Sequence, residues 1–172
     1  RDNVSIEIGE LQKEQAFLTV GFDAPWIGDE DYYGLRILNS ILSGQGGRLF
    51  YELRDRQSLA YSVFARALLG PDASALMVHM GTSPSKLQQA IGGIRREIEK
   101  LRKGDITKEE IDRAKQYIIG SHDIGLQKYS SRAKQMGLDE LYGLGYRHLE
   151  RFSDKIETVD QTELQHLVDT YI

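Results

Sequence analysis

The stretch that organises the chain is residues 43–63, which read SGQGGRLFYELRDRQSLAYSV. Three of the four residues from 44 to 47 are glycine, so the backbone can take turns that a Cβ atom would forbid. Leu49, Phe50 and Leu53 then mark the buried side of a helix of about two turns. The stretch therefore predicts a glycine loop, a short helix, a charged turn and a strand that begins at Ala60 or Tyr61.

Two polar side chains stand at the ends of this unit. Arg54 falls on the last turn of the short helix, and Tyr61 falls at the start of the following strand. Buried elements on both sides hold the two backbones, so we expect the side chains to converge on one exposed point. That arrangement favours binding or catalysis. A purely structural role is the alternative for each residue taken alone: an arginine at a helix C-terminus interacts with the macrodipole, and a tyrosine suits a half-buried strand.

Composition excludes several classes of protein. The 172 residues are 40% hydrophobic and 28% charged, which is ordinary for a globular domain, and the net charge of −4 argues against nucleic acid as a partner. The sequence contains no run of about 18 apolar residues, so it predicts no membrane span. Without cysteine there is no disulfide or thiolate site, and the bacterial periplasm, the cytoplasm and the mitochondrial matrix all stay open. The start at Arg1, with no signal peptide, predicts an excised piece or a processed product.

The rest of the chain predicts strands first and helices afterwards. Val4, Ile6 and Ile8 alternate with other residues as in a strand. Residues 15–22 predict a strand more strongly, and the apolar side chains on both of its sides allow other elements to pack on both faces. Asp29 or Asp31 can cap a helix that ends near Ser43, and its apolar side comprises Leu35, Leu38, Ile41 and Leu42, with Ile37 beside them. Residues 61–69 and 74–81 flank a Gly-Pro-Asp turn and predict an antiparallel hairpin.

Helical signals dominate after residue 83. The helix after Ser83-Pro84 carries an apolar stripe of Leu87, Ile91, Ile94, Ile98 and Leu101. A capping box at 107–110 opens the next helix, and residues 158–161 can cap the last one. This order predicts an α+β fold: a mainly antiparallel sheet of three to five strands covered by helices.

Familiar catalytic motifs are missing. His79, His122, His148 and His166 are far apart, and none begins H-x-x-E-H or its inverse, so no residue is assigned to a metal. No G-x-S-x-G motif is present. The glycine loop could bind phosphate, but it follows a helix and lacks the P-loop lysine and hydroxyl, which favours a tight helix-to-helix connection. Arg48 and Glu52 have the spacing of a surface ion pair on a helix.

The combination in residues 42–65 resembles the M16 metallopeptidases, in their C-terminal domain without zinc. The residues that carry the resemblance are Leu42-Ser43-Gly44, Gly47-Arg48-Leu49-Phe50, Glu52-Leu53-Arg54 and Leu59-Ala60-Tyr61-Ser62-Val63. Glu14-Gln15-Ala16, Pro84 and the helix start at 107–110 fit the same domain, so the resemblance covers nearly the whole chain. It implies one domain over residues 1–172, and this domain would lack the last strand of the family pattern.

The resemblance also implies a function. Members of the family pair two homologous α+β halves, fused or separate, that close like a clamshell around a peptide. One half holds zinc through H-x-x-E-H, and the other supplies an arginine and a tyrosine seven residues apart, the spacing of Arg54 and Tyr61. Arg54 and Tyr61 would contact carbonyl groups of the peptide in the transition state, and Gly46, Gly47, Arg48 and Ser62 would bind substrate.

The partners follow from the same resemblance. They are the zinc-binding half and a peptide, with a second copy of this chain as a further possibility, and the zinc belongs to the other half. The alternatives are a non-catalytic scaffold like the core subunits of a respiratory complex, and a binding module for peptides or phosphorylated ligands.

Overall fold

The computed structural model describes residues 5–9, 13–44, 46–70 and 72–172. Its sheet has the strand order β1 (Ala16–Ala24), β3 (Ser74–Thr82), β2 (Ser62–Leu68), and both neighbouring pairs are antiparallel. The predicted α+β class and the predicted β2–β3 hairpin are confirmed. β2 begins at Ser62, one or two residues after the start at Ala60 or Tyr61 that the sequence predicts.

The register of the strands separates two faces of the sheet. Leu18 and Val63 both lie opposite Met80, and the next row along the sheet joins Val20, Val78 and Ala65. These rows face the core. The opposite face carries Phe17 and Phe64, which are 76% and 44% exposed. Alternation of side chains along a strand explains the separation. Among the described residues, other elements pack on only one face of β1, although the sequence of this strand allowed packing on both faces.

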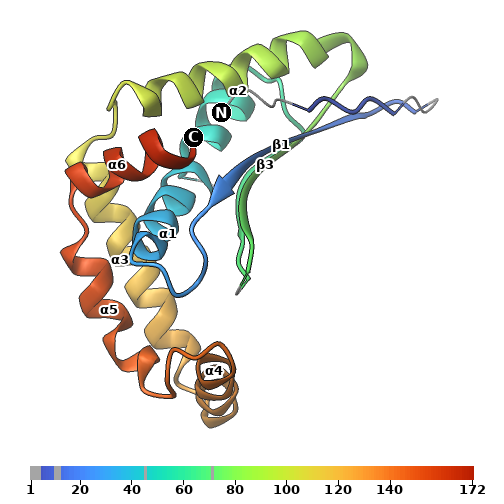
Figure 1. Cartoon of the computed structure of the whole chain (residues 1–172). Helices are drawn as coiled ribbons and strands as arrows, with labels where there is room; N and C mark the ends of the chain where they lie inside the picture. The colour runs from blue at the N-terminus through green and yellow to red at the C-terminus, as the bar shows by residue number, and fades with distance from the viewer. Residues whose placement is uncertain (1–4, 10–12, 45, 71) are drawn as a thin grey trace.

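The helices cover the core face of this sheet. Figure 1 shows α1, α3, α5 and α6 gathered on one side of the strands, with α2 crossing at one end and α4 at the other. Their bounds, with those of the short turn η2, are α1 Asp31–Leu42, η2 Pro84–Lys86, α2 Leu87–Arg102, α3 Lys108–Gly125, α4 Tyr129–Leu141, α5 His148–Thr158 and α6 Gln161–Tyr171. In the described ranges, no helix combines the length and the apolar character that crossing a membrane requires.

Local signals start several helices where the sequence predicts. The Asp29 carboxylate accepts a hydrogen bond from the Asp31 amide at the start of α1. Thr107 and Glu110 form a capping box at the start of α3, and Asp160 and Glu163 form one at the start of α6. The expected buried face of α1, including Leu35 and Leu38, forms part of the core.

One expectation about apolar residues is wrong, and a second holds for most of its residues but not for all. Ile6 and Ile8 lie outside any strand and are largely exposed, while Val4 lies outside the described residues. In α2, Ile91 is 42% exposed. Three residues of the predicted stripe, Ile94, Ile98 and Leu101, are buried as expected, and the buried face also includes Gly93, where a Cβ atom would lie 2.6 Å from Leu53 Cδ2. A close approach at this glycine widens the buried face beyond the residues that hydrophobicity alone predicts.

Candidate functional site

The glycine loop is a tight connection between α1 and the short helix. Gly44 has φ +80°, and the Gly47 amide donates to the Gly44 carbonyl at 3.1 Å. A Cβ atom on Gly47 would lie 2.1 Å from the Ser43 carbonyl oxygen, whereas a Cβ atom on Gly46 would meet nothing within 4 Å. Only Gly47 is therefore required by close packing. This geometry matches the helix-to-helix connection that the sequence favours.

We expect Gly47→Ala to lower the free energy of unfolding by about 1–3 kcal/mol, because the loop must shift to relieve the overlap with Ser43. Gly46→Ala is the matched control and should change stability by less than about 0.5 kcal/mol. Urea denaturation of both variants measures the difference. Equal stability of the two variants would contradict the prediction.

A short π-helical segment follows the loop. This segment, η1 (Phe50–Arg56), carries Leu53 into the core with no exposed surface, and Leu49 just before it is equally buried. Arg54 is exposed on its last turn, with the guanidinium carbon 4.7 Å from the centroid of the Phe50 ring. A guanidinium at this distance from a ring face makes a favourable cation–π contact. The predicted position of Arg54, on the last turn of a helix, is confirmed.

The turn between η1 and β2 is anchored from several sides. Ser58 has φ +49°, its carbonyl accepts from Lys86 Nζ at 2.8 Å, and Arg96 donates to the Gln57 side chain at 3.0 Å. The Leu59 amide donates to the Leu53 carbonyl at 2.8 Å, and the Leu59 carbonyl accepts from Thr82 Oγ1 at 2.6 Å. These contacts hold the backbone between the two candidate side chains in one conformation.

Tyr61 emerges from this anchored turn with its side chain in solvent. Its amide donates to the Gly81 carbonyl at 2.8 Å, and the residue is 58% exposed. Ser62 follows at the first, exposed position of β2. Within the described part of the chain, no hydrogen bond or ion pair involves the side chain of Arg54 or of Tyr61. The side chains of both residues are thus available to a ligand or a partner.

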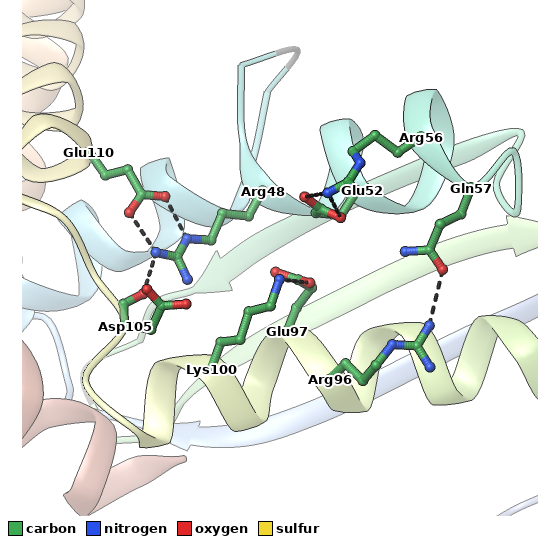
Figure 2. A network of polar contacts seen from close by, with 9 residues as sticks. All are labelled: Arg48, Glu52, Arg56, Gln57, Arg96, Glu97, Lys100, Asp105 and Glu110. Carbon is green, nitrogen blue, oxygen red and sulfur yellow. Dashed lines mark hydrogen bonds and ion pairs between the residues drawn. The ribbon is translucent and has the colours of Figure 1, made fainter.

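Arg48 makes a different ion pair from the one expected. Figure 2 shows its guanidinium pointing away from the η1 helix towards Glu110 and Asp105. Nε donates to Glu110 Oε1 and Nη2 to Oε2, both at 2.5 Å, and Nη2 also donates to the Asp105 carbonyl. Glu52 pairs instead with Arg56, at 2.9 Å. The expected surface pair of Arg48 with Glu52 is wrong, because the start of α3 lies across from the loop and brings the Glu110 carboxylate within reach of Arg48.

The Arg48–Glu110 pair is a fork-to-fork contact between two largely buried side chains, which are 11% and 14% exposed. Burial alone would raise the pKa of Glu110, but the hydrogen bonds from Arg48 and from the Thr107 amide hold that pKa below its ordinary value. Burial alone would lower the pKa of Arg48, and the Glu110 carboxylate raises it instead. Each group therefore stabilises the charged form of the other.

The remaining candidate residues separate in space. A cavity of about 780 Å³ lies between α1 and α3, and Gly46 lines it together with Asn39, Arg113 and Asp139. Gly47, Arg48, Arg54, Tyr61 and Ser62 are not among its lining residues. In the ranges that the structure describes, no group of three or more His, Cys, Asp or Glu residues is placed to hold a metal ion. Sequence patterns do not reveal the lining of this cavity as a whole, because its polar residues come from four separate helices.

The chain resembles known proteins along most of its length. The family model described as the Peptidase M16 inactive domain matches residues 3–118. An uncharacterized zinc protease of Bacillus subtilis, YmxG, is 30% identical over 150 residues, which are 87% of this chain and 37% of that protein. An uncharacterized zinc protease of Mycobacterium tuberculosis, Rv2782c, is 31% identical over 152 residues, 88% of this chain and 35% of its own length. The chain thus spans little more than a third of these curated relatives.

Solved structures support the same fold. A protease from Helicobacter pylori superposes with a TM-score of 0.81 at 23% identity, covering 94% of this chain and 39% of that one. The peptidase M16 inactive domain from Pseudomonas fluorescens superposes with a TM-score of 0.80 at 22% identity, with coverage of 94% and 39%. The predicted resemblance is confirmed, and the chain belongs to the M16 peptidase family, as the domain known as the inactive domain.

Proposed function

We propose that this chain is the substrate-binding half of an M16-type zinc metalloendopeptidase. A second half, fused or separately encoded, would close against it around a peptide and would hold the zinc. The match to the inactive domain supports this division of labour, and so do the relatives that are named zinc proteases. Residues 1–172 would form one domain of the pair.

The zinc of the other half would supply a Lewis acid and an activated water. The part of this chain is to place hydrogen-bond donors where charge develops on the peptide carbonyl, because donors aimed there stabilise the transition state more than the ground state. We assign that role to the Tyr61 hydroxyl. Arg54 would donate to a neighbouring carbonyl of the substrate and orient the phenol. Gly46, Gly47 and Ser62 would complete the peptide contacts. Arg48 would contribute to substrate binding indirectly, because its pair with Glu110 holds the loop in place.

One structural observation carries the proposal. The backbone from Arg54 to Tyr61 is held by hydrogen bonds from Lys86, Arg96 and Thr82, while the two side chains stay exposed and without polar partners among the described residues. Anchored backbones with exposed donors are the arrangement that preorganised stabilisation of a transition state needs. Arg54 and Tyr61 would reach the substrate only when the two halves close around it. Such closure also explains why the two residues would lie on a half that does not hold the zinc.

The test is reconstitution from separate halves. We expect the isolated chain to bind no stoichiometric zinc and to cleave no peptide, and cleavage to begin when a half that carries H-x-x-E-H is added. Metal analysis by mass spectrometry and a fluorogenic peptide measure both properties. One tightly bound zinc per isolated chain, or cleavage without the second half, would exclude the proposal.

A non-catalytic role is the second candidate, and one comparison favours it. A protein of Helicobacter pylori named as a non-peptidase homolog is 29% identical to this chain over 135 residues. Such a domain would assemble with a homologous half, or with a second copy of itself, and bind or scaffold without hydrolysis. The sequence of the second half discriminates the two functions, because a scaffold needs no H-x-x-E-H.

A further inference from the structure

Helix α4 forms part of the wall of the cavity between α1 and α3. Gln135 and Asp139 on α4 line this cavity, and so do His148 and Leu149 on α5. Figure 1 shows α4 at the end of the helical layer, on the side opposite α2. A movement of α4 away from α5 would therefore open the cavity at this end.

Few apolar contacts hold α4 in this position. Of its thirteen residues, all of which the structure describes, Asp139 is the single buried one, whereas the eleven residues of α5 bury three apolar side chains. Leu141, at the end of α4, is 76% exposed. The helix packs mainly against α5, and among the described residues no hydrogen bond joins α4 to α1, α3 or α5. A helix attached in this way belongs to the part of a fold that opens locally most easily.

The residue that α4 does bury disfavours the closed position. Asp139 is 1% exposed, and its Oδ1 accepts from Gln135 Nε2 of the same helix at 2.7 Å. Its Oδ2 has no hydrogen-bond partner among the described residues, and His148 Nδ1 lies 3.6 Å from it, beyond hydrogen-bond distance. The other ring nitrogen of His148 is engaged with the Tyr33 hydroxyl on α1 at 3.0 Å. A buried carboxylate oxygen without a donor is costly, and water would satisfy it once α4 moved away.

The C-terminus of α4 is capped within its own segment. Gly143 has φ +76°, and its amide donates to the Glu140 carbonyl at 3.0 Å. The Leu144 amide donates to the Asp139 carbonyl at 2.9 Å, and the two bonds together form a Schellman motif. This cap uses no residue of another helix, so it does not tie the end of α4 to the rest of the domain.

We propose that α4 is a lid over one end of the cavity between α1 and α3, which opens by separating from α5. The unsatisfied carboxylate of Asp139 weakens the closed position, and the helix buries little apolar surface to offset it. Leu149 is 8% exposed in the closed position but is not part of the connected hydrophobic core. Opening would expose Leu149, whereas Ile156, about two turns further along α5, lies within that core and would stay buried. The lid involves neither Arg54 nor Tyr61, so it does not depend on the proposed function.

Thiol labelling of the 172-residue chain tests the proposal, because the chain has no cysteine of its own. Leu149→Cys reports on the surface next to α4, and Ile156→Cys, on the same helix, is the matched control. An excess of an aromatic disulfide reagent at about pH 8 labels thiols through their thiolate form. We expect Leu149→Cys to react at least about a hundredfold faster than Ile156→Cys, because the latter reacts only after global unfolding. Equal rates would overturn the proposal.

Substitution of Asp139 tests the cause of the opening. Asp139→Leu removes the carboxylate that has no donor, so it should slow the labelling of Leu149→Cys at least about tenfold. Asp123→Leu, at an exposed position of α3, is the matched control and should leave the rate unchanged. The rate of Ile156→Cys in both backgrounds shows whether the stability of the whole fold has changed. An unchanged or faster rate for Leu149→Cys with Asp139→Leu, at an unchanged rate for Ile156→Cys, would refute the lid.

Discussion

Tyr61→Phe should lower kcat/KM for peptide cleavage at least tenfold in the enzyme assembled from both halves, and the expected loss is about a hundredfold. Removal of one donor from a site that stabilises an oxyanion costs on the order of 3 kcal/mol in the transition state. The substitution deletes one oxygen from a side chain that is 58% exposed, so the fold should be unaffected. Steady-state kinetics with a fluorogenic peptide, together with zinc analysis of the same sample, measure the effect.

Tyr51→Phe is the matched control for this prediction. Tyr51 lies on η1 with similar exposure, 55%, but outside the anchored turn from Gln57 to Tyr61. We expect its kcat/KM to stay within about twofold of the wild type, a difference of about 0.4 kcal/mol. Unchanged cleavage by Tyr61→Phe would remove the phenol from the mechanism. Equal losses of kcat/KM in the two variants would mean that the loss does not depend on the position of the tyrosine, which would also contradict the assigned role.

Arg48→Met should lower the free energy of unfolding by about 3 kcal/mol, because it leaves the Glu110 carboxylate largely buried without its cation. The residual exposure of the pair places the effect at the lower end of the range for buried ion pairs. Adding Glu110→Gln should recover most of the loss, since glutamine removes the charge and still serves the capping box at Thr107. Urea denaturation of the two single variants and the double variant gives the coupling energy.

The same pair predicts a dependence on pH. The pKa of Glu110 is lower in the folded chain than its ordinary value of about 4.3, so the pair contributes stability above that pH and loses it as the pH falls through the folded pKa. In Arg48→Met, burial without the cation should raise the pKa of Glu110. The stability difference between wild type and variant should therefore shrink below about pH 4. A difference that stays constant from neutral to acidic pH would contradict this account.

The sequence alone determined the elements whose signals are local. Proline after serine, the capping box at 107–110, the cap within 158–161 and the apolar spacing of α1 place helix starts and one buried face, since these patterns depend on neighbours within one or two turns. The unit of glycine loop, short helix and strand also follows from residues 43–63, and so does the family. The Gly-Pro-Asp turn between two alternating runs was enough to predict the β2–β3 hairpin.

The tertiary structure decided every contact between segments distant in sequence. Arg48 pairs with Glu110, which is 62 positions away, and no local rule favours that partner over Glu52. Gly93 lets the buried face of α2 approach Leu53, and the cavity between α1 and α3 collects Asn39, Arg113 and Asp139 from three helices. Apolar periodicity reports that a face is buried, but what it packs against depends on how the helices are placed around the sheet. For that reason the sequence pointed to Arg54 and Tyr61, which lie seven positions apart, while the cavity is visible only in three dimensions.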